Sequence, residues 1–134
     1  MSCWRHCSCT LSNVDEKILQ EAAKKMGLSI DAGINNVATS YGNYEQNSAN
    51  VDGAFVKNGR QLQLGYLLKG ADGKFEIIGD FYSTGLDSER FIMTLGQLYQ
   101  EINIQIQAEL MGYTVDHVSV NAEGDTEIEI YQWA

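Results

Sequence analysis

Two stretches of the chain carry the same pattern, in which a helix ends and a strand follows at once. Residues 25–31 read KMGLSID, and residues 110–116 read LMGYTVD. In each stretch an amphipathic helix reaches a glycine suited to the left-handed conformation, and small, β-branched and apolar residues come next. A helix that turns directly into a strand, twice, predicts an α+β domain with helices packed on a sheet.

Apolar periodicity and turn residues predict the remaining elements. A period of 3.6 residues predicts helices over residues 14–26 and 87–111, the first opened by a capping box of Ser12 and Asp15. The polar residues 35–50 predict a long loop. Hairpin turns are expected at Asn58-Gly59, Asp72-Gly73 and Glu123-Gly124. Strands are expected over residues 2–11, 28–34, 51–56, 61–68, 75–82, 113–120 and 126–133.

The resulting order is β-α-β-β-β-β-α-β-β. Because the connections through the middle are short, we expect a two-layer sandwich, with a mostly antiparallel sheet and both helices on one of its faces. The chain has 134 residues, of which 44% are hydrophobic, so residues 1–134 are expected to form a single α+β domain with a real core.

Apolar segments in this sequence are short. No run approaches the roughly 18–20 residues of a membrane span, and the first residues lack the apolar centre of a secretory signal. We therefore expect a soluble, cytoplasmic protein that does not insert into a membrane.

The charge balance is acidic, with 18 Asp and Glu against 9 Lys and Arg and a net charge of −9. Arg90 is the last of these cations, and residues 91–134 hold seven acidic residues. Because neutralising phosphates takes cations, this part of the chain is a poor surface for nucleic acid. Its acidic residues either form a solvated surface or form a docking face for a basic protein partner.

The start of the chain concentrates thiols and an imidazole, at Cys3, His6, Cys7 and Cys9. These are the usual ligands of transition metals, so the four residues are a candidate metal site. On a strand, however, Cys3 and Cys7 lie about 13 Å apart and His6 points to the opposite face. The competing interpretation is a buried row of Cys3, Cys7, Cys9 and Leu11, in which the thiols are small core side chains.

No residue set amounts to a recognisable active site, and we identify no catalytic residue and no cofactor. The carboxylate pairs Glu76 with Asp80 and Glu127 with Glu129 are expected to be solvated on outer strand faces. Asp80, at a strand end, is the exception to watch, as a turn cap or a site. Tyr131 and Trp133 share a strand face with Glu127 and Glu129, so these four residues are a candidate interaction surface. The competing interpretation is that Trp133 folds over the edge of the sheet and packs there.

The whole pattern resembles the domain-of-unknown-function family 1257, which includes hypothetical chloroplast and cyanobacterial open-reading-frame products. The resemblance rests on the order and spacing of short motifs: Tyr41-Gly42, Gly65-Tyr66, Asp80-Phe81, Gln97-Leu98-Tyr99, Gly112-Tyr113, Glu123-Gly124 and Trp133. It implies a small cytoplasmic α+β protein without an established activity, encoded near AAA-type ATPases. The family usually has His at the third position, where this chain has Cys3.

These observations favour a non-enzymatic accessory or adaptor protein that works with a protein partner. The resemblance suggests an AAA-type ATPase as that partner. The alternative is a small metal- or ligand-binding protein that uses Cys3, His6, Cys7 and Cys9.

Overall fold

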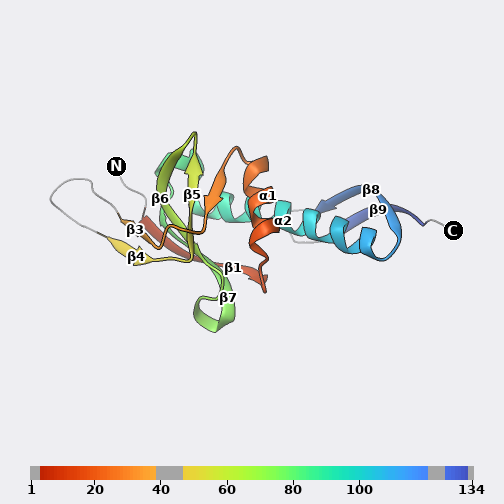
Figure 1. The fold of residues 1–134 in the computed structure, drawn as a ribbon, viewed down its shortest axis with the longest axis horizontal. Coiled ribbons are helices and arrows are strands. Elements are labelled where there is room, and N and C mark those ends of the chain that lie inside the picture. The colour runs from red at the N-terminus through yellow and green to blue at the C-terminus, as the bar shows by residue number, and fades with distance from the viewer. Residues whose placement is uncertain (1–3, 39–46, 121–125, 133–134) are drawn as a thin grey trace.

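A computed structural model describes residues 4–38, 47–120 and 126–132 of the chain (Figure 1). Two α-helices are present, α1 (Glu16–Lys25) and α2 (Ser88–Leu110). Short 3₁₀ turns lie at Ala71–Gly73 and Tyr82–Thr84. The strands are β1 (Trp4–Ser12), β2 (Ser29–Asp31), β3 (Asn36–Ala38), β4 (Ser48–Asn50), β5 (Gly53–Lys57), β6 (Arg60–Leu67), β7 (Lys74–Asp80), β8 (Tyr113–Val120) and β9 (Thr126–Gln132).

The main sheet has five strands in the order β1-β7-β6-β5-β2, and every neighbouring pair is antiparallel. The predicted α+β class and the antiparallel pairing are therefore confirmed. The sheets differ from the prediction in two respects. Strands β3 and β4 pair with each other inside the segment predicted as a loop. Strands β8 and β9 form the predicted final hairpin, but this hairpin is a separate sheet.

Both helices pack on one face of the main sheet, as predicted. Their buried side chains join one core with those of the sheet, including Leu19 of α1, Phe91 of α2 and Phe55, Leu64 and Phe75 of the strands. The opposite face carries a smaller apolar cluster of Val37, Val51 and Ala54. The β3–β4 pair thus adds a small third layer over part of the sheet.

The start of α1 differs from the prediction. Ser12 is the last residue of β1, and the helix is capped instead by Asp15, whose side chain accepts a hydrogen bond from the backbone N–H of Lys17 at 2.8 Å. The predicted end is confirmed. Gly27 has a φ of 77°, and the N–H of Leu28 donates to the carbonyl of Ala23 at 2.9 Å, which completes a left-handed cap.

Two tyrosine hydroxyls hold the first turn of α1 against the core. The hydroxyl of Tyr99 accepts from the backbone N–H of Asp15 at 2.8 Å, and the buried hydroxyl of Tyr66 donates to Glu16 at 2.6 Å. Burial and the neighbouring Glu16 carboxylate raise the pKa of Tyr66 well above its ordinary value. This hydroxyl therefore remains a proton donor at any ordinary pH.

Helix α2 is capped by Asp87, which accepts from the N–H of Arg90 at 2.7 Å, and it ends before Gly112, whose φ is 89°. Its buried side chains, Phe91, Leu95 and Tyr99, all lie at or before its midpoint. Figure 1 shows α2 passing behind the main sheet and then running beyond it, with β8 and β9 beside its far end. Neither described helix combines the length and the hydropathy needed to cross a bilayer.

Candidate interaction surface

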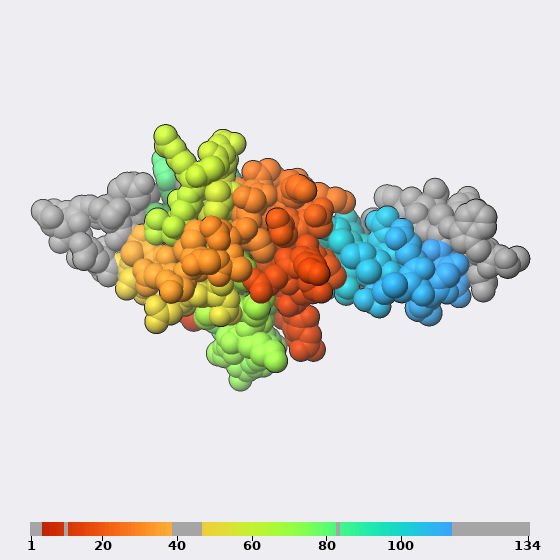
Figure 2. Space-filling model, in the orientation of Figure 1, coloured from red at the N-terminus to blue at the C-terminus, as the bar shows by residue number. Residues whose placement is uncertain are grey.

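The part of α2 that leaves the core is the first candidate site. We call residues 100–112 the α2 arm. Figure 2 shows this segment, in cyan to blue, extending past the body formed by the red, orange and yellow-green segments. Three large apolar side chains on the arm are exposed to solvent: Ile106 by 37%, Leu110 by 76% and Met111 by 73%. An apolar row on a projecting helix is typical of a surface that another protein covers.

The α2 arm carries acidic residues and no cation. The arm carries Glu101 and Glu109, and no Lys or Arg follows Arg90 in the sequence. Glu109 accepts a long hydrogen bond of 3.4 Å from the side-chain amide of Gln105, one helical turn earlier. The arm therefore presents exposed apolar side chains together with two acidic residues.

The four residues predicted as an interaction surface lie near the arm in the chain. Strand β9 contains Glu127, Glu129 and Tyr131, whose backbones pair with Ser119, His117 and Thr114 of β8. The side chains of these β9 residues, and all of Trp133, lie outside the described part of the structure. Strand β8 packs against α2, so the hairpin and the arm form one end of the molecule.

Part of the exposed row belongs to the apolar stripe that predicts helix α2 from the sequence. Ile106 and Leu110 continue the same helical stripe as Phe91 and Leu95, and periodicity alone does not distinguish a covered stripe from an uncovered one. The length of α2 could have indicated that part of the helix is uncovered. A helix of 23 residues extends about 35 Å, which is long for a helix that must pack along its whole length on one small sheet.

The cysteine-bearing start of the chain is strand β1, which pairs with β7 at one edge of the main sheet. Cys9 and Leu11 are each 7% exposed and belong to the main core, and Cys7 is half-buried. His6 lies on the other face, where it meets Glu76. Cys3 lies outside the described residues.

This arrangement divides the predicted metal ligands between two faces of the sheet. Among the residues that the structure describes, no group of three or more His, Cys, Asp or Glu side chains is close enough to hold an ion. A site that uses Cys3, His6, Cys7 and Cys9 together would require β1 to abandon its pairing with β7. The metal site remains a prediction from the sequence.

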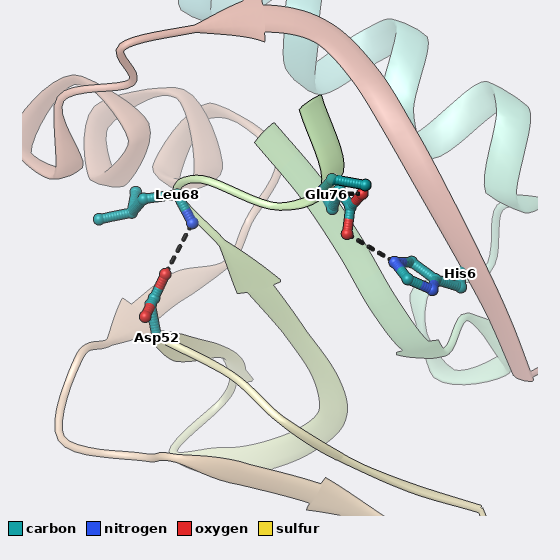
Figure 3. Close-up of polar contacts among 5 residues, drawn as sticks. His6, Asp52, Leu68 and Glu76 are labelled. Carbon is teal, nitrogen blue, oxygen red and sulfur yellow. Dashed lines mark hydrogen bonds and ion pairs between the residues drawn. The ribbon is translucent and has the colours of Figure 1, made fainter. Parts of the chain in front are cut away.

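Glu76 is the largest departure from the sequence-based expectation. It was expected on a solvated face but is only 3% exposed. Figure 3 shows its carboxylate meeting His6 across the β1–β7 pair, with His6 Nε2 and Glu76 Oε2 2.6 Å apart. The backbone N–H of Ala71 donates to its other oxygen at 3.0 Å. The hydrogen bond with His6 holds the pKa of this carboxyl below its ordinary value, although burial opposes that shift.

The chain between β6 and β7 folds over Glu76 and completes its burial. A Cβ at Gly70 would lie 2.2 Å from the carboxyl carbon of Glu76, so only glycine allows this approach. A similar contact links β5 to the end of β6, where Asp52 accepts from the N–H of Leu68 at 2.7 Å (Figure 3). Both carboxylates order turns of the backbone.

Asp80 is also buried, with 6% exposure, so the expectation of a solvated pair with Glu76 was wrong for both residues. Its side chain accepts from the backbone N–H of Tyr82 at 2.9 Å, at the start of a 3₁₀ turn. The turn-cap interpretation of Asp80 is therefore confirmed.

Comparison with known proteins adds one match. A family model described as a protein of unknown function, DUF1257, matches residues 22–128. The chain belongs to the DUF1257 family. The match begins inside α1 and ends inside β9, so it covers the α2 arm and leaves out the cysteine-bearing β1. For this DUF1257 chain, neither a search of curated proteins nor a search of solved structures gives a match.

Proposed function

We propose that this DUF1257 protein is a non-enzymatic accessory protein that binds a protein partner through the α2 arm and the adjoining β8–β9 hairpin. The observation that carries the proposal is the exposure of Ile106, Leu110 and Met111 on a helix that has left the core. Aromatic, methionine and other large apolar side chains dominate the centres of protein interfaces, whereas charged groups occupy the rim.

The buried polar groups of the body support a structural rather than a chemical role for that part of the molecule. Glu76, Asp80 and Tyr66 each make a hydrogen bond that orders a turn or a helix start. The acidic residues of the arm favour a partner with a basic face. An AAA-type ATPase is the first partner to test, because the family resemblance suggested it.

The test is co-purification of the tagged full chain from its native host under reducing conditions, followed by mass spectrometry. We expect a stoichiometric partner with the unaltered chain. Replacing both Leu110 and Met111 with Gln should reduce recovery of that partner at least tenfold, because the few residues at the centre of an interface that dominate binding cost about 2 kcal/mol or more when truncated.

The matched control replaces two exposed apolar residues that lie off the arm, Tyr82 and Met93, with Gln. Their exposed fractions are 64% and 43%, and the control should leave partner recovery within twofold. Equal loss with both double variants would contradict a specific role for the arm. The charge reversals Glu127→Lys and Glu129→Lys test the hairpin separately and should weaken the same complex without unfolding the domain.

A further inference from the structure

A pocket of about 230 Å³ lies on the helix side of the body, away from the α2 arm. It is formed where the end of α1, the end of β5, the turn before α2 and the first half of α2 meet. Its apolar lining consists of Met26, Leu28, Leu86, Phe91 and Leu98.

Phe91 lies behind the pocket, where its side chain is fully buried in the main core. Its ring packs edge-to-face on Phe55, with centroids 5.4 Å apart, and on Phe81, with centroids 5.6 Å apart. A ring held between two others keeps one orientation. The core behind the pocket is therefore ordered before any ligand arrives. The apolar surface that a ligand would meet comes mainly from the partly buried Met26, Leu86 and Leu98.

Two lysines belong to the lining of this apolar space. Lys25 at the end of α1 and Lys57 at the end of β5 both line the pocket, and no Asp or Glu does. In the part of the chain that the structure describes, no carboxylate lies within ion-pair distance of either lysine, whereas the neighbouring Lys24 pairs with Glu21 at 3.9 Å. The whole chain has a net charge of −9, whereas the charged residues that line this pocket are two lysines.

Polar hydroxyls complete the lining, from Thr84 and Thr94. The hydroxyl of Thr84 donates to the carbonyl of Phe81 at 2.6 Å and accepts from the N–H of Leu86 at 3.1 Å, which fixes the turn that walls the pocket. The lining of the pocket thus combines partly buried apolar side chains with two lysines and two threonines.

We propose that this pocket binds a small organic monocarboxylate whose apolar body is about the size of a benzene ring. The apolar residues would cover the body, and Lys25 and Lys57 would meet the carboxylate. Pockets for drug-sized ligands usually span about 300–1,000 Å³, so a volume of about 230 Å³ suits a smaller molecule. This assignment is independent of the α2 arm and its protein partner.

The test is a ¹⁹F NMR titration of the full chain with 4-fluorobenzoate and with its neutral analogue 4-fluorobenzamide. We expect saturable binding of the carboxylate, at least tenfold tighter than that of the amide, and weakening as salt screens the lysines. Backbone amide shifts should change at residues 25–28, 84–86 and 94–98. Absence of saturable binding, equal affinity for the amide, or shifts confined to other residues would overturn the assignment.

Two double variants test whether the charges of Lys25 and Lys57 contribute to binding of 4-fluorobenzoate. Replacing both Lys25 and Lys57 with Met should lower the affinity for 4-fluorobenzoate at least tenfold. The control replaces Lys17 and Lys24 with Met, which removes the same charge from the same acidic chain outside the pocket lining. It should change the affinity by less than twofold. Equal weakening by the two double variants would mean that only the overall charge attracts the anion, and the pocket assignment would fail.

Discussion

A buried carboxylate is stable only where hydrogen bonds replace the water it has lost. Glu76 obtains two, from the half-exposed ring of His6 and from the backbone of Ala71, and both lower its pKa, the bond with His6 by more. The charged form is therefore more stable in the folded chain than in the unfolded one. Its contribution to stability is complete above the unfolded pKa and is lost as pH falls through the lower folded pKa.

This sign gives a prediction for His6→Ala. The variant should lose about 1–2 kcal/mol in the free energy of unfolding at pH 7, because hydrogen bonds to charged groups contribute about 1.5–3 kcal/mol and His6 is partly screened by solvent. Urea denaturation of both chains should be measured between pH 7 and pH 3. The difference in free energy of unfolding between the variant and the unaltered chain should become smaller as Glu76 is protonated.

The control for this variant is Lys24→Ala, which removes the exposed pair with Glu21 and should change stability by less than about 0.5 kcal/mol. A loss in His6→Ala that stays constant across the whole pH range would assign the effect to packing of the ring and contradict the charge argument.

The burial of Glu76 could not be predicted from alternation along β7. Alternation correctly placed the residue on the face opposite Phe75 and Ile77, but it carries no information about what covers that face. The cover comes from His6, about seventy residues earlier, and from the glycine at position 70. Asp80 was recognisable because a turn cap is a local feature.

Helix ends and tight turns are the elements that the sequence predicted best. Gly27, Gly112 and Asn58-Gly59 all have positive φ at the predicted places, because the conformation of a cap or hairpin turn depends on neighbouring residues. Strands β3 and β4 were missed since Asn36, Ser48 and Asn50 have low strand propensity. Their pairing depends on contacts with the main sheet, such as the 2.9 Å hydrogen bond from Ala38 to Gln63.

Within α2, Gly96 offers a test of the contact between the helix and β1. A Cβ at this position would lie 3.7 Å from the sulfur of Cys9, which is ordinary van der Waals contact. Gly96→Ala should therefore stabilise the protein by about 0.5–1 kcal/mol, because alanine favours a helix interior by that amount. Thermal unfolding should show a rise in Tm of about 2–6 °C. A fall in Tm would show that the helix and strand lie closer than described.

On the scale of the whole molecule, the main sheet and the α2 arm differ in how they are supported. The first half of α2 buries Phe91, Leu95 and Tyr99, whereas Leu110 and Met111 at the end of the arm are exposed. Backbone hydrogen bonds that lie outside a packed core open at low free energy. The α2 arm should therefore open without unfolding the body.

Amide hydrogen exchange checks this difference. Amides of residues 101–109 should exchange at least tenfold faster than those of residues 92–99, and binding of the proposed partner should slow exchange in the first group alone. If the amides of residues 101–109 and 92–99 exchange at the same rate in the isolated chain, the prediction is contradicted. The β8–β9 hairpin would then stabilise the arm to the same degree as the core stabilises the first half of α2.

The pairing of β1 with β7 also has a consequence for synthesis. The first strand leaves the ribosome early, but its hydrogen-bonding partner, seventy residues away at the His6–Glu76 contact, emerges later by about 4–14 s at about 5–20 residues per second. During that interval Cys7 and Cys9 belong to a nascent strand with no neighbour. Their thiols are open to oxidants until β7 arrives, and Cys9 becomes inaccessible only when the sheet closes over it.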